Sequence, residues 1–285
     1  MATGGVSRSD ALEAATEAFR AAGIPDPRTD AEVLLAGITA LPRAELVVRS
    51  DEPLEPSESR QFGEAVRRRL QREPVAYILG RQGFRRLELA VDPRVLIPRP
   101  ETERLVEVAL EVSPSRVLEV GTGSGAVALA IADELPACEV VATDISADAL
   151  ALARINAAEL GFAARVGFEL GTWPEGGGRF DLVLANLPYV DRDREASSLQ
   201  PEVISWEPDQ ALFGGKDGIE VIASTLETMS QSGVVAELIA LEVGAGQAPE
   251  VSGLLRGVGF DEFEVRPDLA GIDRVVVGRK STGPG

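Results

Sequence analysis

The fold of this chain is decided by residues 117–125, Val-Leu-Glu-Val-Gly-Thr-Gly-Ser-Gly. An apolar run typical of a buried strand leads into three alternating glycines, and helical spacing begins at Ala126. Glycine lets the backbone turn tightly and approach a ligand, because it has no Cβ. A helix that follows such a turn presents free N–H groups at its first residues. The stretch therefore predicts a strand–loop–helix unit that binds a nucleotide-like molecule.

Strand and helix patterns alternate from this stretch to the end of the chain. We expect strands at 116–120, 139–143, 166–170, 181–185, 238–243, 262–266 and 273–279, and helices at 101–112, 126–135, 147–160, 218–229 and 247–258. Such alternation predicts an α/β fold with a doubly wound, Rossmann-like sheet. Because only a short loop joins the last two strands, we expect an antiparallel pair at the C-terminal end.

Residues 1–75 predict a small helical domain instead. Ser9 is a suitable N-cap for a helix with Leu12 and Phe19 on one face, and further helical patterns begin near Thr29 and at Ser57. Since no group of reactive side chains gathers in this part, we interpret it as a packing or docking domain.

A different pattern covers residues 76–100. Residues 84–89 partly alternate, Asp92-Pro93 turns the chain, and the apolar residues 95–97 follow. We interpret 76–100 as a β-hairpin linker, which leaves 101–285 as the α/β domain.

The chain is strongly acidic, with 28 Lys and Arg against 46 Asp and Glu and a formal net charge of −18. Such a charge disfavours nonspecific binding to nucleic acid, because few phosphates would be neutralised. The arginines at 67–69 and 81–86 are candidates for a local basic patch, but we favour their interpretation as a solvated helix face and a solvated hairpin. The acidic surface favours a basic protein partner through electrostatic steering.

The chain has no histidine and a single cysteine, Cys138. This composition excludes histidine general bases and makes a zinc site implausible, so we expect no metal. A lone cysteine cannot form an internal disulfide, which fits a cytoplasmic location. No apolar run approaches the ~18 residues of a membrane helix, and the first residues lack the plan of a signal peptide. The chemistry must therefore use carboxylates, amides, backbone groups, tyrosine or a reactive cofactor.

The first candidate site is the glycine loop with the acidic residues near it. Asp144 ends the next expected strand, where a carboxylate can accept hydrogen bonds from ribose hydroxyls. Glu119 would repel a diphosphate but not the amino and sulfonium groups of S-adenosylmethionine, and Gly-x-Gly-x-Gly departs from the Gly-x-Gly-x-x-Gly of NAD-binding loops. We therefore expect S-adenosylmethionine rather than NAD. The candidate cofactor residues are Glu119, Gly121, Thr122, Gly123, Ser124, Gly125, Asp144, Asn186 and Trp173, which would flank the adenine.

The second candidate site is Asn186-Leu187-Pro188-Tyr189, after the expected strand 181–185, where ligands of open α/β sheets collect. The Asn186 carboxamide oxygen and the Leu187 carbonyl can each accept one N–H of a planar amide or amine. Pro188 stiffens the turn, and Tyr189 offers a face for the planar group. Because the methyl group of S-adenosylmethionine is already activated, its transfer to such a nitrogen needs no strong base. We assign all four residues to catalysis and substrate binding.

Together these motifs resemble the release factor (glutamine-N5) methyltransferases, the PrmC/HemK family, over nearly the whole chain. The resemblance rests on the two candidate sites and on residues 77–80, 84, 95–103, 207–208, 211–212, 214–218 and 271–275. The segment 97–103 is the most discriminating, since generic methyltransferases lack it. Leu187 is a departure, because the family usually has Asn-Pro-Pro-Tyr, and it bears on the rigidity of the turn more than on its chemistry.

The resemblance implies a class I S-adenosylmethionine-dependent methyltransferase domain and an N-terminal domain that docks a class I peptide chain release factor. The acceptor would be the glutamine of the Gly-Gly-Gln loop in that factor, bound by residues 186–189. No membrane and no direct nucleic-acid partner is expected.

Three alternatives remain open at this point. One is a glutamine-N5 methyltransferase of a ribosomal protein. Another is an adenine-N6 methyltransferase acting on RNA or DNA, since Asn-Leu-Pro-Tyr is familiar from ribosomal RNA adenine dimethyltransferases. The last is a cofactor-binding regulatory module without catalysis.

Overall fold

The computed structural model describes residues 5–281, which divide into two compact units. The first unit contains residues up to Arg81 together with Gln200–Trp206, and the second contains the rest. The predicted linker is not a separate part, because its first residues lie in a helix of the first unit and its hairpin belongs mainly to the second.

The first unit is helical. Its core is formed by side chains such as Phe19, Leu34 and Phe62. The N-cap of the first helix is Ser7, whose hydroxyl accepts the backbone N–H of Asp10 at 3.0 Å, so the prediction of Ser9 was wrong by two residues. The helices are α1 (Arg8–Ala21), α2 (Pro27–Thr39), α3 (Arg43–Val48), α4 (Pro56–Leu70), α5 (Val75–Leu79) and α10 (Pro201–Trp206).

Ion pairs explain why Gln200–Trp206 belongs to the helical unit. Arg69 of α4 was predicted to be solvated but is buried, and its guanidinium lies 2.8 Å from the carboxylate of Glu202 and 2.7 Å from that of Asp30. Arg72 adds a second contact to Glu202 at 3.2 Å. A buried carboxylate needs such partners, so Glu202 fixes its segment against α4.

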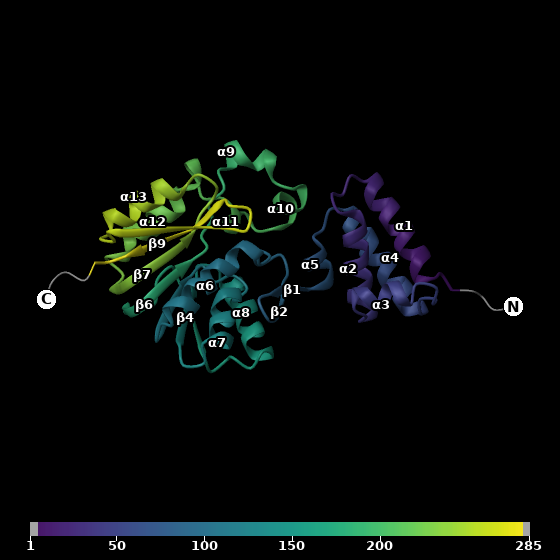
Figure 1. Ribbon diagram of the computed structural model, residues 1–285, viewed down its shortest axis with the longest axis horizontal. Coiled ribbons are helices and arrows are strands. Elements are labelled where there is room, and N and C mark those ends of the chain that lie inside the picture. Colours follow the sequence, from purple (N-terminus) through teal and green to yellow (C-terminus); the bar gives the residue numbers. More distant parts are fainter. Residues whose placement is uncertain (1–4, 282–285) are drawn as a thin grey trace. The chain divides into compact units, whose positions relative to one another are not determined.

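The second unit is built on a seven-stranded sheet of order β5-β4-β3-β6-β7-β9-β8 (Figure 1). β3, β4, β5, β6 and β7 pair in parallel, and β9 runs antiparallel between β7 and β8. This arrangement confirms the doubly wound sheet and the antiparallel C-terminal pair. The strands are β3 (Arg116–Val120), β4 (Glu139–Asp144), β5 (Val166–Leu170), β6 (Gly178–Ala185), β7 (Val234–Glu242), β8 (Glu262–Pro267) and β9 (Asp273–Arg279).

Helices cover both faces of this sheet. α6 (Glu103–Val112), α7 (Ala126–Glu134) and α8 (Ala147–Glu159) pack on one face, whereas α12 (Glu220–Met229) and α13 (Ala248–Gly257) pack on the other (Figure 1). The face with α6, α7 and α8 contains the first core of this unit, and the face with α12 and α13 contains the second core. Val117 of β3 packs into the first core, and its neighbour Leu118 packs into the second core. A strand buried on both faces needs a continuous apolar run, which is the pattern that made β3 recognisable.

The hairpin differs from its prediction. It pairs β1 (Arg81–Phe84) with β2 (Leu87–Ala90), and its turn contains Arg85 at φ 52° rather than Asp92-Pro93. Residues 95–97 form no strand. The hairpin is instead joined to α8, where the Asn156 carboxamide bonds the backbone N–H and C=O of Ala90 at 2.8 and 3.0 Å.

Short elements complete the second unit. They are η1 (Pro100–Thr102), α9 (Arg192–Glu195), η2 (Ala196–Ser198), α11 (Asp209–Leu212) and η3 (Lys216–Gly218). Within residues 5–281, no helix has the length and apolar character needed to cross a membrane.

Candidate functional site

The glycine loop and the Asn-Leu-Pro-Tyr turn follow neighbouring strands that end at the same height in the sheet. Val120 of β3 pairs with Ala185 of β6, so Gly121 and Asn186 are the next residues on each side. β3 is also where the strand order reverses, and ligands of open α/β sheets bind at such a point. Gly121 has φ +76°, and a Cβ there would lie only 3.3 Å from the side chain of Leu187. The positive φ favours glycine at this position, and a Cβ would also crowd the Leu187 side chain of the other motif.

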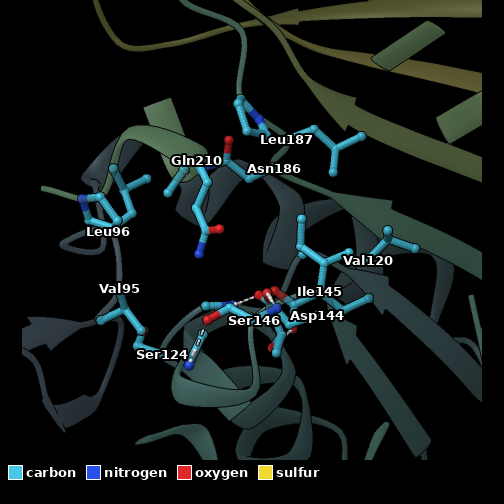
Figure 2. A pocket seen from close by; sticks show the side chains of 18 of the residues that line it. Val95, Leu96, Val120, Ser124, Asp144, Ile145, Ser146, Asn186, Leu187 and Gln210 are labelled. Atoms are coloured by element: carbon cyan, nitrogen blue, oxygen red, sulfur yellow. Dashed lines mark hydrogen bonds between the residues drawn. The ribbon is translucent and has the colours of Figure 1, made fainter. Parts of the chain in front are cut away.

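A cavity of about 430 Å³ opens at this edge of the sheet, within the usual size range of ligand sites. Its wall brings together the predicted residues Glu119, Gly121, Thr122, Gly123, Ser124, Asp144, Asn186, Leu187 and Pro188. Figure 2 shows Asp144 and Ser146 on one side of the cavity, Asn186 and Leu187 on the other, and Gln210 extending into it.

Three predicted residues lie outside the wall. Gly125 is the N-cap of α7 and has φ 85°. The Trp173 indole N–H donates to the Thr228 hydroxyl at 3.0 Å, and its neighbour Thr172 lines the cavity instead. Tyr189 turns its hydroxyl toward Glu242, where it donates at 3.2 Å. Contacts of these three residues with a ligand stay predictions.

Glu119 is a buried carboxyl group in the wall. One of its oxygens accepts the Thr122 hydroxyl at 2.6 Å and the Ala128 backbone N–H at 3.0 Å. Burial raises its pKa from 4.5 to about 8. Without a positive partner this group is therefore mostly protonated at neutral pH, and a cation in the cavity would favour its ionised form.

Asp144 is held by the backbone on both of its oxygens. One oxygen accepts the N–H of Gly123 and the other that of Ser146, each at 2.8 Å. Burial raises the pKa of Asp144, and these hydrogen bonds oppose that shift. Each carboxylate oxygen has a further lone pair, so the fixed side chain can still accept from a ligand hydroxyl.

We expect Glu119→Gln to flatten the pH dependence of stability. Because the folded pKa of about 8 lies above the ordinary 4.5, the folded protein holds this proton more tightly than the unfolded chain does. The contribution is complete below about pH 4.5 and is lost as the pH rises toward 8. Urea unfolding without cofactor should give a steeper fall for the wild type over this window.

The control for that measurement is Glu139→Gln, which removes an exposed carboxylate from the first residue of β4. It should keep the slope of the wild type. Equal slopes for the wild type and Glu119→Gln would contradict a proton held by burial at position 119.

The turn at residues 186–189 and the residue after it are held by hydrogen bonds to other segments of the chain. The Gln247 side chain donates to the Tyr189 carbonyl at 2.9 Å. Val190 then pairs its N–H with the Leu212 carbonyl and its carbonyl with the Gly214 N–H, both at 3.0 Å. Leu187 is 7% exposed and packs into the second core. These contacts hold the Leu187 side chain and the backbone at Tyr189 and Val190 in place.

The discriminating segment 97–103 is bound to the same site. Glu207 accepts the Ile97 backbone N–H at 3.1 Å and forms an ion pair with Arg99. At the end of the segment, the Thr102 hydroxyl accepts a hydrogen bond from the Asn186 side-chain nitrogen at 2.9 Å. No individual role was predicted for Thr102 or Glu207, although both lie in motifs that carry the resemblance, and no pattern indicated Gln210.

The wall fits the expected cofactor on its own chemistry. At Gly123, φ is +56° and no atom lies within 4 Å of where a Cβ would project, so the backbone is open to a close ligand. Asp144 offers acceptors for hydroxyl groups, and Glu119 favours a cation. A molecule with a ribose and positive charge matches this donor set better than a diphosphate does.

Two family profiles match the chain. One, described as the PrmC N-terminal domain, covers residues 10–80, and the other, a methyltransferase domain, covers residues 111–230. Two proteins named release factor glutamine methyltransferase, from Koribacter versatilis and Cereibacter sphaeroides, are each 40% identical over 95% of this chain and 98% of their own. A third of that name, from Geobacter sulfurreducens, is 41% identical over 90% and 91%.

Solved structures agree on the fold. The hMettl16 catalytic domain, solved with a MAT2A 3′UTR hairpin, gives a TM-score of 0.56 at 11% identity over 80% of this chain and 83% of its own. A methyltransferase from Pyrococcus furiosus gives 0.51 at 18% identity, with 68% and 89% covered. At these identities the likeness confirms the methyltransferase fold and nothing finer.

Proposed function

The chain belongs to the release factor glutamine methyltransferase family, and from this premise we propose that it methylates the side-chain N5 of the glutamine in the Gly-Gly-Gln loop of a class I release factor, using S-adenosylmethionine. The observation that carries the proposal is one cavity whose wall contains both the glycine loop and Asn186. The first would bind the methyl donor, and the second would bind the acceptor amide.

Glu119 and Asp144 would hold the cofactor, which supplies an activated methyl group. Asp144 accepts from the ribose hydroxyls with lone pairs that its backbone hydrogen bonds leave free. Glu119 balances positive charge, and Gly123 lets the backbone come close. Gly125 starts the adjoining helix, and Trp173, next to Thr172 in the wall, is the proposed residue on the adenine side.

The chain acts on the acceptor by positioning it. A glutamine amide is a weak nucleophile because its nitrogen lone pair is delocalised. Asn186 Oδ1 and the Leu187 carbonyl accept its two N–H bonds, which orients the nitrogen and stabilises the positive charge that develops there. Pro188 keeps the two acceptors in a fixed relation, and Tyr189 would contact the planar group. The proton leaves to water after transfer, so no histidine is needed.

The helical unit is the proposed docking part for the release factor, since its match to the PrmC N-terminal domain covers residues 10–80. Charge supports a protein partner over RNA. Arg68, Arg69 and Arg85 are each paired with a carboxylate, so these arginines do not offer free positive charge to phosphates. The same proposal places the protein in the cytoplasm, where translation is terminated.

The test is incubation with methyl-labelled S-adenosylmethionine and four separate acceptors: a class I release factor, the same factor with its loop glutamine replaced by alanine, ribosomal protein, and ribosomal RNA. We expect label only on the intact release factor. Label on RNA alone would overturn the proposal in favour of adenine methylation, and label on ribosomal protein alone would move it to the other glutamine substrate.

A further inference from the structure

A line of hydrogen-bonding side chains runs from the cavity wall into the protein interior. The Asn186 side-chain nitrogen donates to the Thr102 hydroxyl at 2.9 Å. The Thr102 hydroxyl also faces the carboxyl group of Glu242, the last residue of β7, and acts to lower its pKa as a hydrogen-bond donor would. Glu242 is 1% exposed, and its Oε1 also accepts the Tyr189 hydroxyl at 3.2 Å. Two residues of the Asn-Leu-Pro-Tyr turn thus converge on one buried carboxyl group.

The number of hydrogens gives this line a direction. A hydroxyl has one hydrogen, and the accepting oxygen of Glu242 has none, so Thr102 donates inward. Its lone pairs then face Asn186, which must present its NH₂ group to them. Asn186 Oδ1, on the other branch of the carboxamide, is left for a ligand in the cavity that Asn186 lines. If the amide were reversed, NH₂ would meet the substrate's own N–H bonds.

We propose that Thr102 and Glu242 are positioning residues that hold the Asn186 carboxamide with its oxygen available to the acceptor amide. This inference rests on the proposed function for its catalytic consequence, but the orientation itself is a property of the protein alone. It also gives the discriminating segment 97–103 a physical task, since Thr102 is the residue through which that segment reaches Asn186.

The surroundings of Glu242 supply a readout that ordinary packing would not. Burial, with a smaller contribution from Glu101 of η1, raises its pKa from 4.5 to about 7 against the opposing effects of Thr102, Tyr189 and Arg274 of β9. Its Oε2 has no hydrogen-bond partner among residues 5–281 and can carry the proton. Because the ionised carboxylate is the stronger acceptor, turnover should rise as the pH passes through about 7.

The decisive variants are Thr102→Val, which removes the hydroxyl at nearly constant shape, and Thr102→Ser, which keeps it. We expect Thr102→Val to lower kcat about 10- to 100-fold with the Kd for S-adenosylmethionine unchanged, and Thr102→Ser to restore most of the rate. A loss of cofactor binding in parallel with kcat, or equal rates for valine and serine, would overturn the proposal.

A second readout needs neither substrate nor cofactor. The Asn186 side-chain NH₂ pair can be identified in a ¹⁵N NMR spectrum by its absence in Asn186→Ala. Its chemical shifts should change and its hydrogens should exchange faster with water in Thr102→Val but not in Thr102→Ser. An Asn186 signal that stays unchanged in Thr102→Val would refute the orienting role, whatever the activity of the protein. A wild-type protein that is inactive on release factors would refute the proposed function instead.

Glu242→Gln keeps an accepting oxygen but removes the ionisable carboxyl group, so it tests the two separately. Glutamine can keep an oxygen at Oε1 and place its NH₂ at the unpartnered Oε2 position, so the Asn186 signal should stay while the rise of kcat near pH 7 disappears. The matched control is Glu237→Gln, on the same strand but exposed and paired with Arg179. It should keep the pH profile of the wild type. A profile that is identical in Glu242→Gln and the wild type would remove Glu242 from the proposal.

Discussion

Asn186→Ala is expected to lower kcat by about 100- to 1000-fold, the usual cost of removing one preorganised hydrogen-bonding group from a transition-state site. The variant removes the side-chain acceptor for the substrate N–H and leaves only the Leu187 carbonyl. The proposed cofactor residues Glu119 and Asp144 are held by Thr122 and by backbone N–H groups, none of which involves Asn186. The Kd for S-adenosylmethionine should therefore change far less than kcat.

The measurement is steady-state methylation of a release factor, together with cofactor binding by calorimetry. Asn186→Asp is the informative companion, because it keeps the side-chain volume and an acceptor oxygen but loses the N–H bond donated to Thr102. We expect its rate to fall between those of the wild type and the alanine variant. An alanine variant with a rate near that of the wild type would exclude Asn186 as the group that binds the amide.

Gly214→Ala is expected to disable the enzyme by displacing the Asn-Leu-Pro-Tyr turn. A Cβ at position 214 would lie 2.4 Å from the Pro188 carbonyl oxygen and 2.4 Å from that of Gly218. Both neighbours are backbone atoms, so no side chain can rotate away. We expect a loss of about 1–3 kcal/mol in unfolding free energy, typical of overpacking, and a fall in kcat of about 100-fold, because a shift of about 1 Å suffices for that.

Gly253→Ala is the control for this steric argument. Gly253 is exposed within α13, and a Cβ there would meet nothing within 4 Å. Alanine at that position should stabilise the protein by about 0.5–1 kcal/mol and leave kcat unchanged. Urea unfolding and methylation rates of both variants provide the comparison. A Gly214→Ala enzyme as active and stable as the Gly253→Ala enzyme would mean that the turn is not fixed by its contact with Gly214.

The success of the sequence predictions follows from how the elements are stabilised. β3 could be predicted because a strand buried on both faces is mostly apolar, as Val117, Leu118 and Val120 are, and its bounds agree with the prediction. The short helices α3, α5, α9 and α11 contain too few residues for a periodic pattern, so they were missed. The hairpin turn was misplaced because Asp92-Pro93 is the stronger local turn signal, whereas Arg85 at φ 52° adopts an uncommon conformation for a non-glycine residue.

In the candidate site, too, only residues in local sequence patterns could be predicted. Glu119 and residues 121–124 could be predicted because they lie at the end of β3 and directly after it, and residues 186–188 because they directly follow β6. The line from Asn186 through Thr102 to Glu242 could not, since it joins residues 84 positions apart and then extends to another strand. The packing that brings these residues together does not produce a local pattern. Trp173 was predicted to stack on a ligand because it is a large aromatic residue in a loop after a strand, but its indole N–H is hydrogen-bonded to Thr228 outside the wall.

Because Gln200–Trp206 belongs to the helical unit, the polypeptide passes between the two units three times rather than once. The helical unit is therefore not a detachable N-terminal module. A fragment that starts at residue 82 would still contain Glu202 but would lack Asp30 and the arginines with which that carboxylate is paired. The third passage ends at Glu207, which accepts a hydrogen bond from the Ile97 backbone and forms an ion pair with Arg99 in the cavity wall. Exchange of the helical unit between relatives would thus require residues 200–206 to be exchanged with it.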